Sequence, residues 1–436
     1  MSAALWACAD ETATLTEAVE AGGRAMAEVP GPAWRRAVPL TFGARPQIVV
    51  APTGAATTMW SDQFGIHGAH RPSASSSWVP LILRDRFPVS KLWIRGDDAG
   101  AVTVAWTQGG SFPSPHAIWV NHFVPADGSW GTPRQVQPAQ QFHPDVDLAV
   151  SSSGDAVVVW TGVEGGASVI RAIRFTAATG WQAPQLVESV ERASLIAPRV
   201  GIDAHGNAAV IWEHRMSRSV MVSRSTGAAW STPEAMTTSL HHGFGWGVAA
   251  HGDGNAVAVW GDAGGAVVAR RFTPAAGWAA IETIGVVGDG HDYDPNVVAN
   301  DRGTIAVAWL GGSASQVMTS RFTPQGGWVN ESIPAIDAAE TARPSAPSLA
   351  LGATDDAFLL WSVQEAGSGA IWGTSSAGTG AWRTPQVISI NPRPAFAPRV
   401  AIEPAGGAVA VWHQLVPIQG SPPVEPMPRV VVSQYR

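Results

Sequence analysis

Histidines, carboxylates and aromatic side chains gather in three short stretches of the sequence that are rich in glycine or proline. Histidine and aspartate can bind a divalent metal ion or exchange protons during catalysis. Together with tyrosine and tryptophan they also suit a sugar, because aromatic faces stack on it and carboxylates accept hydrogen bonds from its hydroxyl groups. These stretches supply His143, His241, His242, Trp246, His291, Asp292, Tyr293 and Asp294.

The spacing of these residues matches no metal-binding motif such as H-E-x-x-H, so we expect neither a metal ion nor a cofactor. A different chemistry is suggested by three Arg-Pro pairs, because convergent guanidinium groups can hold a carboxylate in a bidentate manner. These pairs begin at Arg45, Arg343 and Arg393. Whether any of these groups converge depends on the fold.

The arrangement of tryptophans reveals an internal repeat of about 50 residues, a period typical of repeat architectures. One series ends the same short apolar segment each time: Trp60, Trp106, Trp160, Trp212, Trp260, Trp309, Trp361 and Trp412. A second series follows a turn rich in glycine or serine: Trp34, Trp78, Trp130, Trp181, Trp230, Trp278, Trp328 and Trp382. The two series take up most of the 21 tryptophans, and we expect them to pack in the core.

Each repeat unit can be divided into four strands, which we name A to D. In one unit these are residues 197–203, 208–212, 220–224 and 230–235, with a turn at 204–207 whose Gly and Asn tolerate positive φ. Strand B is apolar on both faces, so we expect it to be buried between neighbouring units. Such units predict an all-β protein, a β-propeller of four-stranded antiparallel blades.

The ends of the chain indicate how many blades there are and how the ring closes. Eight strand-B tryptophans predict eight blades, with seven blades and one irregular unit as the alternative. The last unit, from Ala397 onward, lacks strand D, whereas residues 31–39 around Trp34 form a strand D without a unit. We therefore expect this N-terminal strand to complete the last blade and to protect the sheet edges. Residues 31–436 form one propeller domain, and residues 1–30 form a tether or the remnant of an export signal.

In such a ring the loops from D to A and from B to C open on one face. The three stretches fall in D–A loops, and His214 and His413 directly follow strand B. This face is therefore the predicted ligand site, with His143, His214, His241, His242, Trp246, His291, Asp292, Tyr293, Asp294 and His413 as its candidates. Trp246, Trp93 and Trp119 belong to neither tryptophan series, and we expect them to be more exposed than the tryptophans of the two series.

The unit reads P-x-V-A-x-D-x-x-G-N-A-x-A-V-W, followed by R-F-T-x-x-x-G-W-x-x-P. It resembles an uncharacterised repeat of secreted and surface proteins of bacteria, and it stands here as Pro198–Trp212, Pro295–Trp309 and Pro398–Trp412. The resemblance covers nearly the whole chain beyond residue 31. It implies an exported, propeller-like protein and no particular activity.

Composition restricts the partners and the compartment. The formal net charge of −7 argues against nucleic acid as a partner. Cys8 is the only cysteine, which rules out disulfides and cysteine-based zinc sites. The segment Leu5–Cys8 resembles a lipobox, but Trp6 is bulky and no long apolar segment precedes it, so a lipid anchor at Cys8 and an ordinary cysteine both stay open. No segment reaches the ~18 apolar residues of a membrane span, and we expect an extracellular, periplasmic or cell-surface monomer.

Three functional hypotheses follow. The favoured one is an exported, non-catalytic propeller that binds a glycan or a surface protein on the D–A/B–C face. The alternatives are a hydrolase or lyase that acts on glycans through loop carboxylates and histidines, and a structural scaffold without a small ligand. Catalysis needs two ionisable groups within reach of one substrate bond. No pair of carboxylates has a spacing that forces such convergence, so binding is favoured over catalysis.

Overall fold

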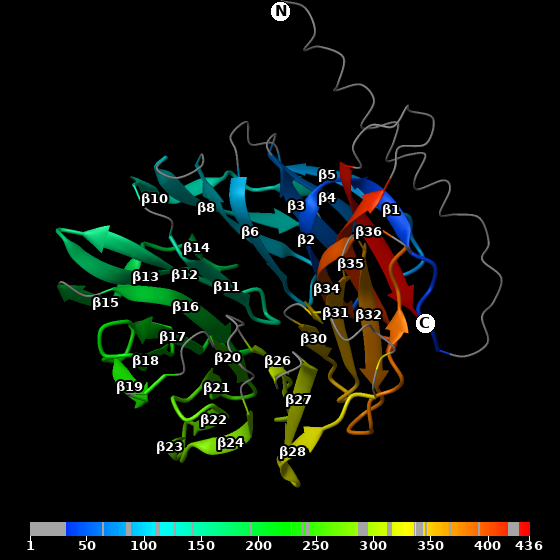
Figure 1. The fold of residues 1–436 in the computed structure, drawn as a ribbon. Coiled ribbons are helices and arrows are strands. Elements are labelled where there is room, and N and C mark those ends of the chain that lie inside the picture. Colours follow the sequence, from blue (N-terminus) through cyan, green and yellow to red (C-terminus); the bar gives the residue numbers. More distant parts are fainter. Residues whose placement is uncertain are drawn as a thin grey trace, which may run out of the picture.

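The computed structural model describes residues 32–436 except 63–64, 84–88, 110–113, 126–127, 142–143, 192–193, 228, 238, 241–244, 287–294, 312–315, 335, 337–342, 345–346, 366–367, 391–392 and 417–426. Within these residues the chain forms eight antiparallel sheets arranged as the blades of a ring (Figure 1). The prediction of an eight-bladed, all-β propeller is confirmed, and the seven-blade alternative is wrong. No helix in the described part of the chain is long and apolar enough to cross a membrane.

The first four blades follow the chain from the N-terminal side. Blade 1 is β2 (Ala44–Val50), β3 (Ala56–Asp62), β4 (Gly65–Arg71) and β5 (Val79–Leu83). Blade 2 is β6 (Val89–Gly96), β7 (Val102–Gln108), β8 (His116–Val124), β9 (Ser129–Trp130) and β10 (Arg134–Gln140). Blade 3 is β11 (Val146–Val150), β12 (Ala156–Glu164), β13 (Ala167–Thr176), β14 (Gly180–Trp181) and β15 (Gln185–Glu191). Blade 4 is β16 (Leu195–Ile202), β17 (Ala208–His214), β18 (Ser219–Ser225) and β19 (Glu234–Thr237).

The other four blades complete the ring. Blade 5 is β20 (Trp246–His251), β21 (Asn255–Gly261), β22 (Ala266–Thr273), β23 (Gly277–Trp278) and β24 (Glu282–Val286). Blade 6 is β25 (Asn296–Ala299), β26 (Ile305–Gly311), β27 (Gln316–Thr323) and β28 (Gly327–Glu331). Blade 7 is β29 (Arg343–Pro344), β30 (Ser348–Leu351), β31 (Ala357–Glu365), β32 (Ser368–Ser376) and β33 (Gln386–Val387). Blade 8 is β34 (Ala395–Ile402), β35 (Ala408–Val416), β36 (Met427–Tyr435) and β1 (Val38–Phe42).

The two ends of the described chain meet in blade 8. Strand β1 pairs antiparallel with β36, with Val38 opposite Val432 and Phe42 opposite Arg429. Just before β1, Trp34 forms a β-bridge with Tyr435. Figure 1 shows this contact as the blue β1 beside the red β36. The predicted closure by the N-terminal outer strand is confirmed.

The strand-B tryptophans seal the interfaces between blades. All eight are at most 2% exposed. The buried side chains divide into eight core clusters, each with one of these tryptophans and apolar residues from an adjacent blade. Trp212, for example, shares a cluster with Val187 on the outer strand of the preceding blade, and its Nε1 donates to Glu188 Oε2 at 2.5 Å. At Gly285 a Cβ would lie 2.3 Å from the Trp309 ring, so glycine is needed for this close approach.

The second tryptophan series packs at the outer part of the blades. Most of its members are half-buried, and several lie against a phenylalanine of strand C. The ring centroids are 5.1 Å apart for Phe123 and Trp130 and 5.5 Å apart for Phe322 and Trp328. These tilted contacts fall within the distances preferred by aromatic pairs. The second series therefore also packs on its own blade, as expected.

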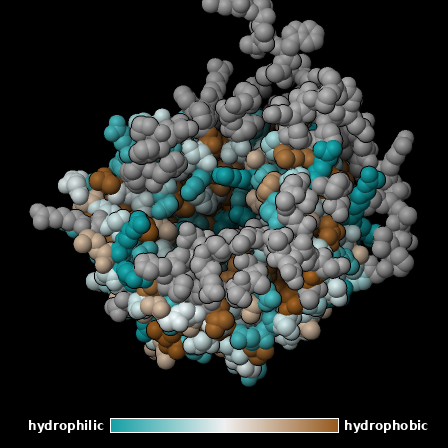
Figure 2. All heavy atoms as spheres, viewed as in Figure 1, coloured by the Kyte–Doolittle hydropathy of each residue, from teal (hydrophilic) through white to brown (hydrophobic). Residues whose placement is uncertain are grey.

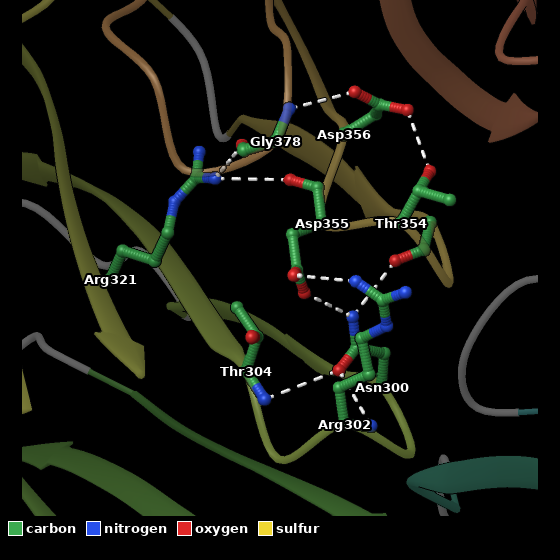
Figure 3. Close-up of polar contacts among 9 residues, drawn as sticks. Asn300, Arg302, Thr304, Arg321, Thr354, Asp355, Asp356 and Gly378 are labelled. Carbon is green, nitrogen blue, oxygen red and sulfur yellow. Dashed lines mark hydrogen bonds and ion pairs between the residues drawn. The ribbon is translucent and has the colours of Figure 1, made fainter. Parts of the chain in front are cut away.

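Polar contacts join neighbouring blades on the face that carries the A–B turns. Figure 3 shows such a contact between blades 6 and 7, where Asn300 of blade 6 donates to Asp355 Oδ1 of blade 7 at 2.8 Å. Within blade 7, Gly378 N donates to Asp356 Oδ1 at 2.7 Å. Arg321 reaches from β27 of blade 6 to the carbonyl of Asp355 in blade 7 at 3.1 Å. Strand-C arginines of other blades make the same crossing: Arg174 to Gly206 O at 2.8 Å and Arg224 to Gly254 O at 3.1 Å.

The junction where the ring closes carries a buried ion pair. Arg71 of blade 1 donates to Glu403 Oε1 of blade 8 at 2.5 Å, and their side chains are only 1% and 5% exposed. The Arg71 guanidinium also lies 5.2 Å from the centre of the Trp78 ring. Because removal of one partner leaves the other charge buried and uncompensated, this pair ties the first blade to the last.

We expect Arg71→Met to lower the free energy of unfolding by about 3–5 kcal/mol, because it leaves the Glu403 carboxylate buried without its cationic partner. Arg71→Met combined with Glu403→Met should cost less than Arg71→Met alone. Urea unfolding of the full chain measures both effects. The matched control is Arg171→Met, since the Arg171–Glu164 pair lies within one blade and is 26% and 46% exposed, and it should cost at most about 1 kcal/mol. Equal losses for Arg71→Met and Arg171→Met would contradict this role of the junction.

Candidate functional site

Most of the loop residues chosen from the sequence lie outside the described residues. Their role in a ligand site therefore stays a prediction. They are His143, His241, His242, His291, Asp292, Tyr293 and Asp294. Among the residues that are described, no group of three or more His, Cys, Asp or Glu side chains is placed to hold a metal ion.

Trp246 was expected in an exposed loop, and this prediction is wrong. It is the first residue of β20, pairs opposite Trp260, and is only 6% exposed. Its Nε1 donates to the carbonyl of Ala197 in the preceding blade at 2.9 Å. Trp93 in β6 and Trp119 in β8 lie within strands and are half-buried, as are most tryptophans of the second series. Trp246 thus joins two blades.

His214 and His413 lie at the ends of β17 and β35, on the predicted face. The Nδ1 atom of His214 is 3.0 Å from the hydroxyl of Ser217. His413 Nδ1 accepts the backbone N–H of Arg45 at 3.3 Å, and its ring stacks on Phe396. Burial, and then the nearby charge of Arg45, lower the pKa of His413 to about 4. The neutral imidazole of His413 thus accepts a hydrogen bond from the backbone of Arg45 and thereby supports the start of blade 1.

Arg45 itself sits in a strained bulge. Its φ of 53° is left-handed, and the register between β2 and β3 shifts between Ala44 and Gln47. The Arg45 side chain is exposed, and the side chain of Arg343 lies outside the described residues. Convergence of the three Arg-Pro arginines therefore stays a prediction.

A cavity of ≈ 710 Å³ lies where the innermost strands of all eight blades meet. Its walls come from β2, β6, β11, β16, β20, β25, β30 and β34 and the residues just before them. Figure 2 shows a hollow at the centre of the molecule with hydrophilic residues in its wall. Volumes of ~300–1,000 Å³ are usual for small-molecule sites, so this central channel is the candidate site.

One level of this channel is lined by a ring of equivalent positions. On each inner strand, one residue pairs with the residue just before the strand-B tryptophan; Asp147, for example, is opposite Val159, and Arg199 is opposite Ile211. We call these eight residues the channel ring. They are Gln47, Trp93, Asp147, Arg199, Gly247, Asn296, Ser348 and Arg399.

The channel ring varies where the rest of the repeat is nearly uniform. It holds two arginines, an aspartate, two amides, a serine, a glycine and a tryptophan. The position two residues farther along each inner strand is much more uniform. It is small and apolar in seven blades, and in blade 2 it is Arg95. The seven small residues are Val49, Ala149, Gly201, Ala249, Val298, Ala350 and Ala401. Close packing between blades explains why the level of small residues is uniform. The varied, polar residues of the channel ring suit recognition of an asymmetric ligand.

Two carboxylates of the channel, Asp145 and Asp147, hold the next blade. Asp145 Oδ2 accepts the backbone N–H of Ala197 at 3.1 Å, and Asp147 Oδ2 accepts that of Val200 at 3.0 Å. Ser348 does the same for Val400 at 3.2 Å. These acceptors satisfy backbone donors on the inner strands of the next blade.

The His413 finding predicts a pH dependence of stability. Because its folded-state pKa of about 4 lies below the unfolded value, the unfolded state binds the proton more readily. Stability should therefore be highest above pH ~6.5 and fall as the pH drops towards 4, by about 2–3 kcal/mol from this group.

His413→Gln should remove that part of the decline, as measured by urea unfolding at pH 7 and pH 4.5. The histidines His70, His122 and His251, whose pKa values are also lowered by burial, titrate in both proteins and cancel in the comparison. An equal decline in both proteins would contradict the assignment.

Comparisons with known proteins find proteins of similar fold but do not assign the chain to a family. No family model matches the chain, and no curated protein matches it. Among solved structures, the BP39L lectin from Burkholderia pseudomallei superposes with a TM-score of 0.54 at 14% identity, over 80% of this chain and 100% of the lectin.

Two further structures are similar to this chain. One from a study of two prolyl endopeptidases gives a TM-score of 0.50 at 14% identity, over 93% of this chain and 59% of that chain. The lectin of Aleuria aurantia, in complex with Fucα1-6GlcNAc, gives 0.41 at 12% identity, over 67% of this chain and 96% of that one. At such identities the similarity is one of fold: this chain shares the β-propeller architecture with proteins of different activities.

Proposed function

We propose that this protein is an exported, non-catalytic β-propeller that binds a saccharide in its central channel, entered from the D–A/B–C face. The observation that carries the proposal is the channel ring. A half-buried indole, two guanidinium groups, two amides and a carboxylate line one level of a ≈ 710 Å³ cavity. Pockets with an aromatic wall and a few placed polar groups are typical of small-ligand sites.

Two tryptophans, Trp93 and Trp246, line this cavity, and the less buried Trp93 offers the surface for a sugar ring. It lines the cavity and packs against the core cluster that blade 3 shares with blade 2. An indole fixed by its neighbours offers apolar area at little cost in conformational entropy. Gln47 on β2 and Asp147 on β11 flank it at the same level and can accept or donate hydrogen bonds to hydroxyl groups.

Binding is favoured over hydrolysis by the roles of the channel carboxylates. Among the described residues that line the cavity, Asp145 and Asp147 are the only carboxylates. Both accept hydrogen bonds from backbone amides of β16, so each carboxylate is held in the interface between blades 3 and 4. Glycoside hydrolysis needs one carboxylic acid that gives a proton and a second that acts as base or nucleophile. The similarity of fold to the BP39L lectin is in keeping with binding.

Export rests on the sequence. We propose that the segment up to residue 30 tethers the propeller, with Cys8 as the lipid attachment point and the first residue of the tether. We also propose that the ring acts as a monomer at the cell surface, in the periplasm or outside the cell. The cavity has the size of a small-molecule site, which favours a glycan over a protein surface as the ligand.

A glycan array probed with the full chain tests this function. We expect binding to a defined set of glycans, unchanged by EDTA, with at least a tenfold loss in Trp93→Ala. The matched control is Trp130→Ala, which removes another half-buried tryptophan of the same blade, outside the cavity, and should keep the signal. Mass spectrometry of the bound glycan should find it uncleaved. Silence across the array, equal binding by Trp93→Ala, or cleaved sugar would each contradict the proposal.

A further inference from the structure

The channel carries more positive than negative charge, although the protein as a whole is acidic. Its formal net charge is −7. The described residues that line the channel, however, include four cations and two carboxylates. The cations are Lys91, Arg95, Arg199 and Arg399, and the carboxylates are Asp145 and Asp147. A basic cavity in an acidic protein concentrates anions at that one place.

Two of these arginines flank a single blade. Arg399 belongs to the inner strand of blade 8 and Arg95 to that of blade 2, with blade 1 between them. Both side chains line the same cavity. Burial lowers the pKa of Arg399, and the positive charge of Arg95 lowers it further. Like charges held together in a cavity raise the free energy of the empty site, and a bound anion offsets that repulsion.

Arg95 also departs from the repeat. At its level the other seven blades have alanine, valine or glycine, which the close packing of inner strands explains. The long cationic side chain of Arg95 is instead exposed and lines the channel. Its Nη1 donates to the carbonyl of Ile94 at 2.8 Å, and Arg399 Nη1 donates likewise to Pro398 at 2.9 Å. A carbonyl orients a guanidinium group without neutralising it.

Three neighbouring blades thus present complementary groups on one side of the channel. Arg399 comes from blade 8, Gln47 from blade 1, and Trp93 and Arg95 from blade 2. Trp93 and Arg95 are two residues apart on β6, so they point to the same side of that strand. A planar anion between two guanidinium forks would lie next to an indole face.

The A–B end of the channel, which begins just beyond Arg95 on β6, carries carboxylates. Burial raises the pKa of Asp98, which follows β6, and the charges of Asp97 and Asp301 raise it further. Asp301 lies in the A–B turn of blade 6, across the ring from blade 2. Arg95 therefore lies between these carboxylates and the channel ring. Because the carboxylates disfavour an anion at the A–B end, the D–A/B–C face is the entry that suits an anionic ligand.

We propose that the ligand is an acidic saccharide, whose anionic group binds between Arg95 and Arg399 while its sugar ring stacks on Trp93. This inference rests on the proposed function and narrows it. A carboxylate or a sulfate group accepts paired hydrogen bonds from guanidinium groups, and both classes of sugar share this chemistry.

The test uses paired glycans and three single variants of the full chain. The array carries oligosaccharides with uronic acid, sialic acid or sulfate beside their uncharged counterparts, and calorimetry then measures the best pair. We expect the acidic member to bind at least tenfold more tightly. Arg95→Gln and Arg399→Gln should each weaken the acidic member about tenfold and thereby reduce its preference over the neutral member. Arg36→Gln removes an exposed arginine outside the cavity and should alter neither; thermal unfolding verifies that each variant is folded.

The outcomes separate the two proposals. Equal or tighter binding of neutral glycans, with Trp93→Ala still disruptive, overturns the anionic preference and keeps the proposed function. Acidic glycans that bind Arg95→Gln and Arg399→Gln as well as the wild type overturn the assigned position. If neither class binds the wild-type protein, both proposals fail.

Discussion

The whole molecule depends on the pairing of β1 with β36, because that pairing turns a row of blades into a ring. Each blade has two apolar faces, and its strand B is buried only when both neighbours are present. In an open row the first and last blades would each expose one such face and an unpaired sheet edge. The N-terminal strand removes the edge, and the ion pair between Arg71 and Glu403 lies across the same junction.

Closure also creates the site. Eight inner strands that meet around one axis leave a channel that no single blade could form, and their common register brings one residue of each to the same level. The repeat is nearly invariant where it must pack, as in the strand-B tryptophans and the small residues beside the axis. It varies in the channel ring, where packing makes few demands. Within one repeat unit, some positions therefore stabilise the fold, whereas the channel-ring position is free to contact a ligand.

Much of the fold could be predicted from the sequence, because the tryptophan period marks each blade and the incomplete units at the two ends complement each other. The prediction for Trp246 fails because the glycine-rich segment before it gives no sign that β20 begins at this residue. Its register opposite Trp260 then buries it. Histidines in loops do not mark the channel ring, because its residues lie on strand A and differ in type from blade to blade. The ring can nevertheless be located from the sequence as the strand-A position that pairs with the residue before each strand-B tryptophan.

Sequence alone gave no reason to prefer the arginines that line the channel over those in Arg-Pro pairs. Arg399 follows a proline, whereas Arg45 precedes one, and only the strand register shows which of the two reaches the channel ring. Arg95 stands out only when it is compared with its equivalents in the other blades. Such positions require knowledge of strand pairing as well as of periodicity.

Ring closure is tested most directly by a cross-link between Val38→Cys and Val432→Cys in a chain whose Cys8 is replaced by serine. These residues face each other across β1 and β36 and share one core cluster, and facing Cα atoms of antiparallel strands lie within the range that a disulfide spans. Mild oxidation should give an intramolecular disulfide that joins the N-terminal and C-terminal peptides after proteolysis. Val38→Cys with Val79→Cys, on the outer strand of blade 1, should stay reduced. Free thiols in both pairs, or cross-links only between molecules, would contradict the closed ring and the channel that depends on it.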